Sequence, residues 1–429
     1  MKCFSFLLRP KVVSLSLLIS LISESQAGEA FFAETAEEGS VLSDDAGSGS
    51  GDWLKEIKTW GTHRIPDDNP WFQGLNFTGR FQYQLVYTDV EDVDGRDLQT
   101  TTDEIRRWRY TAELDVLKYL RITGSINVSG DARRNGGDFD FGFQAHDVAL
   151  LRLDAGAILE DAYGWDSLDK LHFTFGRYKH AIGYEVQQSS KTLFTPQRTS
   201  LSTLVFQSAR PTAAVVDLTK DALDVRLALY STSEGSRFVN GFNDGLAYYA
   251  GLHYHVTDDW SVRSEFFYND ADEGDDPLLE FEWLSSLSLD YDGGNWGFFV
   301  NGILGDNGDA SNGVTDSNRQ GIFGGVIVNP WYWIVEDKLQ LVGRYQYAGS
   351  EESEGFRISS RFIRDAATSE NQDVNGGFGA ENHAIYLGLN YHIIDHRLKI
   401  QAGVEYEFLD TPEGDVEGFT YQLAFRTFF

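Results

Sequence analysis

An alternation of apolar and polar residues with a period of two runs through most of the chain after residue 75. Between residues 398 and 408, Leu, Ile, Ala, Val, Tyr and Phe occupy the even positions, and Lys, Gln, Gly and Glu occupy the odd ones. Residues 120–129 and 223–229 alternate in the same way. Successive side chains of a β-strand point to opposite faces, whereas a helix would repeat its apolar residues at intervals of three and four. The pattern therefore predicts strands with one apolar and one polar face.

Sixteen segments carry this pattern and are predicted to be strands. They cover residues 75–90, 104–117, 120–130, 143–155, 170–178, 209–219, 222–232, 246–256, 260–268, 280–291, 295–304, 320–329, 337–348, 382–393, 397–408 and 417–429. The connections after even-numbered strands are mostly tight, and those after odd-numbered strands are mostly long and acidic, such as 91–103, 179–208, 305–319 and 349–381. Short turns at one end and long loops at the other are typical of an outer-membrane barrel.

The predicted fold is an all-β transmembrane antiparallel barrel of about 16 strands. An even number of strands places both termini on the short-turn, periplasmic side. A barrel of this size leaves an aqueous channel, so its apolar face meets lipid and its polar face meets water. Several aromatic residues near strand ends fit the girdles that such barrels place at the membrane interfaces. They are Trp108, Tyr110, Trp260, Trp283, Trp331 and Trp333.

The two ends of the chain indicate its destination. Residues 1–27 have the basic start, short apolar stretch and small residues before Gly28 that define a secretory signal peptide. Residues 28–74 are predicted to be an acidic, flexible periplasmic segment, because such a Ser/Gly-rich composition cannot bury a core, and residues 75–429 the barrel. The last strand stops on Phe429, which resembles the C-terminal assembly signal of bacterial outer-membrane proteins. The predicted location is therefore the bacterial outer membrane.

Composition narrows the class further. The formal net charge is −31, which excludes a nucleic-acid binder that relies on a broad basic surface. Hydrophobic residues make up 41% of the chain and the mean hydropathy is −0.33, which excludes a polytopic helical membrane protein. The single cysteine, Cys3, lies in the predicted signal peptide. We therefore expect no disulfide, no thiol nucleophile, no metal bound by cysteine and no cofactor in the mature chain.

The third long connection has a distinctive sequence. Residues 175–185 read Phe-Gly-Arg-Tyr-Lys-His-Ala-Ile-Gly-Tyr-Glu, followed by Ser189-Ser190-Lys191 and then Gln197-Arg198-Thr199. This stretch resembles the phosphate-selective porin O and P family, which typically reads G-Q-F-K-P-P-F-S-x-E, then T-S-S, then E-R-S. The matching residues are Gly176, Lys179, Glu185, Ser189, Ser190 and Arg198. Two departures are His180-Ala181 in place of two prolines and Gln197 in place of the acid before Arg198.

The resemblance implies a passive, often trimeric channel whose third loop folds into the barrel and narrows it. Its partners would be outer-membrane lipid and lipopolysaccharide, small hydrophilic solutes or ions, and further copies of the chain in a homotrimer, with no nucleic acid. Anion selectivity, for phosphate among others, is implied for those members that carry a basic ladder in the lumen. Passive diffusion of small hydrophilic solutes is accordingly the expected function, and no enzymatic activity is expected.

Candidate pore residues follow from strand parity. Arg80, Arg226 and Arg344 lie at mid-strand on the predicted polar faces, and Lys179, Glu185, Lys191 and Arg198 belong to the third loop. Together these seven residues are expected to surround the constriction and to favour anions locally, although basic and acidic residues balance over the whole predicted lumen. The alternative is that each arginine pairs with a carboxylate on a neighbouring strand and stiffens the wall.

Other patterns leave alternatives open. His253 and His255 share a strand face, where they fit either pore-wall polarity, which we favour, or a metal pair. The acidic run Asp89–Gly95 lacks the full spacing of a calcium loop. A plugged barrel for binding or adhesion is the main alternative to a porin. A barrel lipid esterase is a further alternative, but His172, which faces the predicted lumen, has no identifiable serine partner.

Overall fold

The computed structural model describes residues 62–64, 69–129, 141–180, 182–206, 210–232, 242, 245–270, 281–308 and 321–429. The predicted signal peptide and most of the predicted N-terminal segment lie outside these residues. None of the helices in the described part combines the length and apolar character that a membrane span requires.

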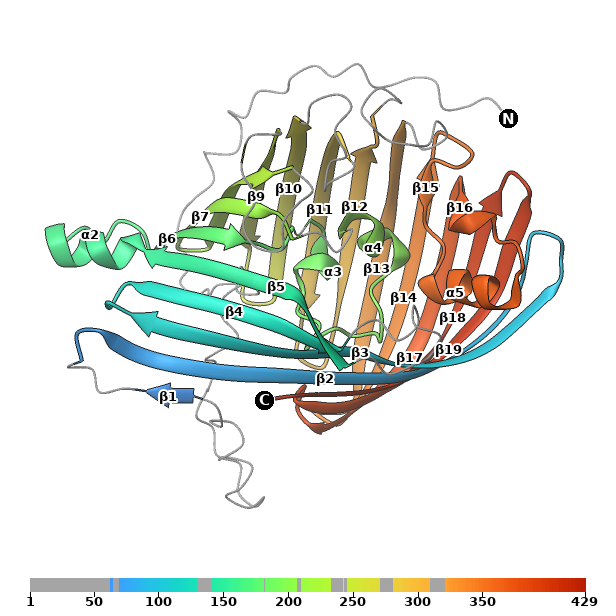
Figure 1. Cartoon of the computed structure of the whole chain (residues 1–429), viewed down its shortest axis with the longest axis horizontal. Coiled ribbons are helices and arrows are strands. Elements are labelled where there is room, and N and C mark those ends of the chain that lie inside the picture. The colour runs from blue at the N-terminus through green and yellow to red at the C-terminus, as the bar shows by residue number, and fades with distance from the viewer. Residues whose placement is uncertain are drawn as a thin grey trace.

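Sixteen antiparallel strands close into a barrel (Figure 1). In ring order they are β2 (Phe72–Glu91), β3 (Asp97–Val116), β4 (Leu120–Ser129), β5 (Phe141–Asp154), β6 (Lys170–Arg177), β7 (Thr212–Lys220), β8 (Leu223–Ser231), β9 (Leu246–His255), β10 (Trp260–Asp270), β11 (Trp283–Asp292), β12 (Trp296–Asp306), β13 (Ile322–Val335), β14 (Leu339–Ser350), β17 (Glu381–Ile394), β18 (Leu398–Thr411) and β19 (Gly414–Phe428). Each predicted strand overlaps one of these, so the predicted fold class is confirmed.

The last strand closes the barrel against the first. β19 pairs with β2 from Glu417 opposite Glu91 to Phe428 opposite Arg80. Gly79 and Phe429 then exchange backbone hydrogen bonds of 3.0 and 3.1 Å. Beyond that point the short strand β1 (Thr62–Arg64) pairs with residues 74–76 of β2. Three residues are too few for an alternating pattern, so the sequence did not predict β1.

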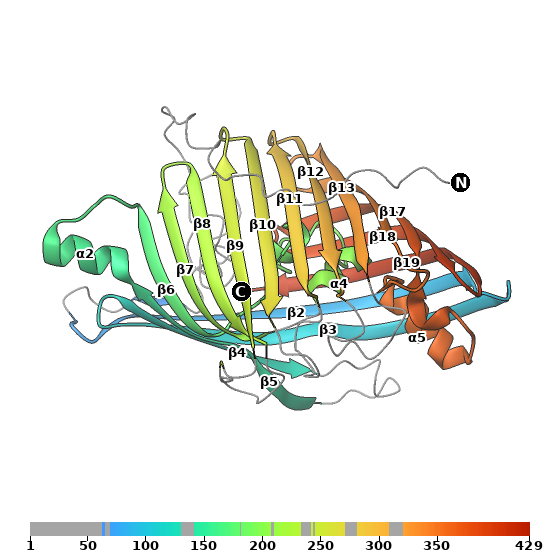
Figure 2. The same cartoon turned by 90° about the horizontal axis from the view of Figure 1, so that it is seen from above.

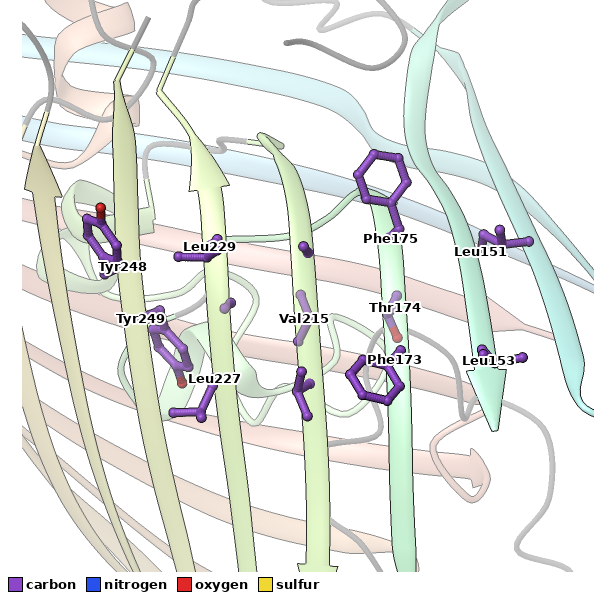
Figure 3. Close-up of a pocket in the computed structure, with 13 residues that line it drawn as sticks. Leu151, Leu153, Phe173, Thr174, Phe175, Val215, Leu227, Leu229, Tyr248 and Tyr249 are labelled. Atoms are coloured by element: carbon purple, nitrogen blue, oxygen red, sulfur yellow. The ribbon is translucent and has the colours of Figure 1, made fainter. Parts of the chain in front are cut away.

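Many apolar side chains face outward and many polar side chains face inward, the reverse of the distribution in a soluble protein. On β8, Leu227 and Leu229 are 48% and 42% exposed, whereas the intervening Ala228 and the preceding Arg226 are buried. The outward face over β5–β9 forms a shallow apolar groove, and Figure 3 shows Phe173 and Phe175 of β6 among the side chains that line it. This is the arrangement that a lipid-facing exterior requires.

The loop predicted over residues 91–103 is wrong in its extent. β2 and β3 form one long hairpin (Figure 2), and residues 92–96 alone connect them. Thr88 pairs with Thr100, and the Gln99 side chain donates to Asp89 Oδ1 at 3.0 Å. Threonine favours strands, so the run Thr100–Thr102 extends the hairpin despite the acidic residues around it.

Helices occupy three of the connections. α2 (Ala155–Tyr163) lies at the short-turn end, where Asp154 caps it by accepting from the Ala157 amide at 3.0 Å. The third loop contains α3 (Tyr184–Gln187) and α4 (Ser200–Phe206). The connection between β14 and β17, which we call the seventh loop, contains β15 (Phe356–Arg357), α5 (Arg361–Glu370), η4 (Asn375–Gly377) and β16 (Phe378–Gly379). The strand-based prediction located none of these helices.

Two residues of the predicted aromatic girdle face inward instead. Trp331 is 8% exposed and stacks on Phe194 of the third loop with ring centroids 5.8 Å apart. The ring centroid of Trp333 lies 4.9 Å from that of His392, also on the inner side. The lipid-facing positions of β13 are instead Tyr332 and Ile334. Parity therefore moves these tryptophans into the lumen, and the girdle prediction is wrong for both.

Replacement of Gly176 should destabilise the folded barrel. Its φ is +133°, and an added Cβ would lie 2.1 Å from the carbonyl oxygen of Ala149 on the neighbouring strand. Strain of this kind costs on the order of 1–3 kcal/mol. Gly176→Val should therefore lower the temperature at which the folded form unfolds, as measured by heat-modified migration on gels. Gly124→Val is the matched control, because its Cβ would meet nothing within 4 Å. An equal fall in unfolding temperature in Gly176→Val and Gly124→Val would contradict the expected strain at Gly176.

Candidate functional site

The third loop, which joins β6 to β7, crosses the lumen. Figure 1 shows α3 and α4 inside the ring of strands, and Figure 2 shows α4 there from a second direction. The loop leaves the wall at β6 and reaches β14, which lies eight strands away from β6 in either direction around the ring. The predicted inward fold of this loop is therefore present, and the loop divides the interior from wall to wall.

Wall residues hold α3 through its backbone and its aromatic ring. The amide of Gly183 donates to Glu265 of β10 at 2.6 Å, and the amide of Tyr184 donates to Asn301 of β12 at 3.0 Å. The Tyr184 ring stacks on Phe299 with centroids 4.2 Å apart. A helix of four residues leaves most of its amides without helical partners. Glu265 and Asn301 supply acceptors for the amides of Gly183 and Tyr184 at its N-terminus.

Arg344 of β14 fastens the loop to the opposite wall. One guanidinium nitrogen donates to Glu185 at 3.2 Å, to the Thr195 hydroxyl at 2.7 Å and to the carbonyl of Gln197 at 2.7 Å. The other terminal nitrogen donates to Glu405 of β18 at 2.5 Å. Because Arg344 is only 4% exposed, these charge-assisted bonds are shielded from water and are stronger than surface ones.

The tip of the loop lies against β17, β18 and β19. Lys399 donates to the carbonyl of Leu193 at 2.9 Å, and Asn390 donates to the carbonyl of Phe194 at 2.8 Å. Arg426 donates to the carbonyl oxygen of Ser190 at 3.3 Å. Polar side chains from the inner face thus bind the loop by its backbone carbonyls.

A group of arginines, which we call the basic cluster, gathers beside the loop. It comprises Arg80 of β2, Arg106, Arg107 and Arg109 of β3, Arg198 of the loop and Arg426 of β19. The charge of Arg107 lies close enough to those of Arg106, Arg109, Arg198 and Arg426 to be repelled by each of them. Several protein regions therefore focus positive charge on one part of the lumen.

The acceptors around the basic cluster include several neutral groups. Arg107 donates to the Gln82 side chain at 2.8 Å, and Arg80 donates to the Ser190 hydroxyl at 2.5 Å. Within the described part of the chain, neither Arg107 nor Arg426 forms an ion pair with a carboxylate. The guanidinium groups of Arg107 and Arg426 therefore lie here beside neutral acceptors.

The seven residues named from the sequence take different positions. Arg80 and Arg198 join the basic cluster, and Arg198 donates to the carbonyls of Glu185 and Gln188 at 2.6 Å each. Glu185 and Arg344 form the ion pair described above, with oxygen and nitrogen 3.2 Å apart. Lys191 is buried, and its ammonium lies 4.9 Å from the centre of the Phe428 ring.

Two of the seven lie where they support structure. Lys179 is buried at the base of the loop, where its ammonium donates to the carbonyl of Val186. Arg226 pairs with Asp217 directly across the β7–β8 ladder at 2.6 Å. This is the geometry of the alternative in which an arginine stiffens the wall. The sequence thus grouped residues that the fold divides between the lumen, the loop and the wall.

Arg106 is a functional candidate that strand parity missed. Strict alternation places it on the lipid face, between Ile105 and Arg107. A β-bulge shifts the register of β2 and β3 between Gln82 and Tyr83, and Arg106 donates to the Gln197 side chain of the loop at 3.2 Å. A bulge re-aims a side chain without any mark in the alternating pattern, so no sequence signal identified Arg106.

His180 contributes no positive charge to the lumen. Its ring is fully buried at the base of the loop, with its centroid 4.8 Å from that of Phe267 and 5.7 Å from that of Tyr230. Burial lowers the pKa of His180 to about 3, with a smaller contribution from Arg210. The imidazole is therefore neutral at physiological pH and packs as an aromatic ring against Phe267 and Tyr230. The phosphate-selective porin O and P family typically has proline at this position.

The seventh loop narrows the barrel at the long-loop end. Ile363, Ala366 and Ala367 of α5 pack into the same apolar cluster as Leu98 of β3 and Leu409 of β18. The backbone amide of Ser360, which caps α5, donates to Glu407 of β18 at 2.9 Å. The third loop and the seventh loop therefore both restrict the lumen, the seventh loop at the long-loop end.

Comparison with known proteins supports the fold. No family model and no curated protein matches the chain. Among solved structures, OmpF of Salmonella typhi in complex with daunomycin is 14% identical, with 86% of this chain and 100% of that chain covered and a TM-score of 0.53. OprB of Pseudomonas putida is 11% identical, with 83% of this chain and 94% of that chain covered and a TM-score of 0.48. A loop L8 deletion mutant of OmpT, an outer membrane protein of Vibrio cholerae, is 14% identical, with 83% and 99% covered and a TM-score of 0.48.

The OmpF likeness shows that this chain has a porin-type barrel fold. At 14% identity it carries no statement about solute or selectivity. The resemblance of the third loop to the phosphate-selective porin O and P family remains a prediction, since no family model matches.

Removal of Arg344 should release the third loop. Arg344→Met leaves the buried carboxylate of Glu185 and the partly exposed one of Glu405 without this partner, and breaking a buried ion pair costs about 3–5 kcal/mol. Trypsin added to the folded variant should then cleave after Lys191 and Arg198 faster than in the parent protein, as followed by mass spectrometry. Arg121→Met is the control, since Arg121 pairs with Asp115 on the neighbouring strand. Equal cleavage in the parent and in Arg344→Met would contradict the role of Arg344.

Proposed function

We propose that this protein is an outer-membrane porin, a passive water-filled channel for small hydrophilic solutes. The observation that carries the proposal is a closed barrel with an apolar exterior, a polar interior and a loop anchored across the lumen. Solutes would enter at the long-loop end, pass between the third loop and the wall, and leave at the short-turn end. Size and hydration at this constriction would limit passage.

The proposal includes a preference for anions, with phosphate as a candidate solute. The basic cluster supports it, because fixed charges of one sign at a constriction set the selectivity of a channel. Arg80, Arg107 and Arg198 would line the path, and Lys191 would add to their field from the loop. Arg344 and Glu185 would hold the loop in place, while Lys179 and Arg226 would stabilise its base and the wall.

A plugged barrel for binding or adhesion is the second candidate. Its support is the same loop, which makes hydrogen bonds to β10, β12, β14, β17, β18 and β19. A loop fixed at so many points can close a lumen as well as narrow it. The two functions differ in ion flow and not in fold.

No enzymatic activity is part of the proposal. A barrel lipid esterase would need a serine–histidine pair on the lipid face. His383 of β17 faces outward, but its partners are the Tyr345 hydroxyl at 2.9 Å and Glu381 at 3.0 Å. His172 faces the lumen, 3.6 Å from Asp154.

The remaining parts of the proposal concern location and assembly. Residues 1–27 would be removed as a signal peptide. Residues 28–74 would form the periplasmic segment, except that its last three residues begin β2, and residues 75–429 would form the barrel in the bacterial outer membrane. The apolar exterior would contact lipid and lipopolysaccharide. Three copies would assemble into a homotrimer, which chemical cross-linking in native membranes would detect as a threefold mass.

Planar-bilayer recording tests the function directly. The purified protein should give stable open steps, and in a potassium chloride gradient its reversal potential should have the sign of anion preference. Protein that inserts without any conductance would support the plugged barrel and refute the porin. A reversal potential of the opposite sign would refute the anion preference and leave the channel intact.

Arg107→Gln should weaken the anion preference. Removal of one unit charge about 10 Å from the solute path changes the energy of a monovalent anion by about 0.4 kcal/mol in water. The anion-to-cation permeability ratio should fall about twofold or more. Arg121→Gln is the control, because it removes the same unit charge far from the basic cluster: Arg121 lies opposite Asp115, eight residues along β3 from Arg107. An unchanged ratio in Arg107→Gln would exclude the basic cluster as the selectivity element.

A further inference from the structure

Three inward-facing side chains meet at the short-turn end of the barrel, far along the wall from the basic cluster. Asp224 lies at the start of β8, and His253 and His255 lie at the end of β9. Asp224 is directly opposite His253 in the β8–β9 ladder, and His255 follows two residues later on the same face. Register and parity therefore bring a carboxylate and two imidazoles together, and we call them the triad.

The separations within the triad match those of metal ligands. Asp224 Oδ2 lies 3.5 Å from His253 Nδ1 and 3.5 Å from His255 Nε2. All three ligand atoms lie within 4.8 Å of one another. Ligands held at about 2.0–2.1 Å from a tetrahedral zinc ion are about 3.3 Å apart. Small side-chain rotations would therefore close the triad around one ion.

Hydrogen bonds outside the triad orient His253. Its Nε2 lies 2.9 Å from the hydroxyl of Ser261, and that hydroxyl donates to Asp290. A serine hydroxyl has a single proton, so Ser261 accepts from Nε2–H and His253 carries its proton there. In the neutral form of His253, Nδ1 is then the unprotonated nitrogen, and it faces the carboxylate of Asp224. Two acceptors that face each other at 3.5 Å are stabilised by a cation between them.

Asp224 is oriented in the same way. The hydroxyl of Thr219 donates to its Oδ1 at 2.6 Å, which leaves Oδ2 directed to the two imidazoles. Metal-binding histidines and carboxylates are characteristically held by such outer hydrogen bonds. Asp290 adds a second carboxylate through its hydrogen bond with Ser261. Arg263 lies directly opposite His253 in the β9–β10 ladder, and its guanidinium lies over the ring of Tyr184, 5.8 Å from its centre.

We propose that Asp224, His253 and His255 form a lumenal binding site for a divalent late transition-metal ion, with Zn²⁺ as its representative. Two imidazoles and one carboxylate favour zinc, copper or nickel over magnesium and calcium, which prefer oxygen ligands. Three protein ligands leave a coordination position open. His255 is the least buried of the three, so that position lies on its side, toward the lumen.

Calorimetric titration of the purified full chain in detergent tests the site, with ZnCl₂, MgCl₂ and CaCl₂ as the probes. We expect one Zn²⁺ per barrel and no saturable binding of Mg²⁺ or Ca²⁺ in the same range. His253→Gln, His255→Gln and Asp224→Asn should each weaken Zn²⁺ binding by more than about tenfold. Ser261→Ala, which removes only the orienting hydroxyl, should weaken it by about 10–100-fold.

His383→Gln is the matched control, because it removes a histidine that pairs with a carboxylate, Glu381, outside the triad. Its Zn²⁺ affinity should equal that of the parent protein. The proposal is overturned if the parent protein binds no Zn²⁺ below millimolar concentration, if His253→Gln binds as the parent does, or if His383→Gln loses as much affinity. Far-ultraviolet circular dichroism verifies that each variant is folded.

A spectroscopic measurement on the parent protein keeps the test decisive if the triad variants fail to fold. Co²⁺ in a site with nitrogen and oxygen ligands and low coordination gives visible absorption bands that Zn²⁺ removes on displacement. Such bands, titrating to one equivalent, would support the triad as the site. Their absence would show that the triad is an ion-paired cluster of the wall.

Discussion

Backbone pairing without an edge is the constraint on which this structure depends. In hydrocarbon an unpaired amide or carbonyl has no water to bind, so a sheet in the membrane must close on itself. The β19–β2 seam satisfies this requirement through the last residue of the chain, since Phe429 and Gly79 still exchange hydrogen bonds. With the backbone paired all round, alternate side chains are free to meet two different solvents.

The interior follows from that closure. A ring of sixteen strands encloses more space than wall side chains can fill, and the third loop occupies part of it. The loop leaves the wall at β6 and is fixed by polar bonds to Glu265 of β10, Asn301 of β12 and Arg344 of β14, and β14 lies eight strands away from β6. Because these hydrogen bonds hold the loop inside the barrel, the basic cluster faces a narrow aqueous space. A narrow space with low-dielectric walls strengthens the electric field of fixed charges.

The sequence predicted the barrel well because alternation is a local property that closure preserves. It predicted the third loop through its resemblance to a known pattern and not through physical chemistry. Strand parity found Arg80, Arg226 and Arg344 on the inner face, but it failed at Arg106, where a bulge changes the register. The girdle prediction failed at Trp331 and Trp333, because nearness to a strand end does not determine which face a residue occupies, whereas parity places both on the inner face.

Pairing was a further limit on prediction. Whether an arginine points into open lumen or to a carboxylate depends on which strands are neighbours and in what register. Arg226 and Asp217, or Arg344 and Glu185, are brought together by the closed ring and the loop. The triad of Asp224, His253 and His255 shows the same principle, since the sequence offered two histidines and the register added the carboxylate.

Single-cysteine labelling in lipid vesicles tests the central claim, that one face of each strand meets water and the other meets lipid. Thr111 and Ala112 are adjacent on β3, and Ala112 is exposed on the outer face. No other thiol is expected in the mature chain, because Cys3 lies in the predicted signal peptide. A membrane-impermeant maleimide should label Thr111→Cys rapidly and Ala112→Cys hardly at all. Faster labelling of Ala112→Cys, or equal labelling of both, would contradict the account.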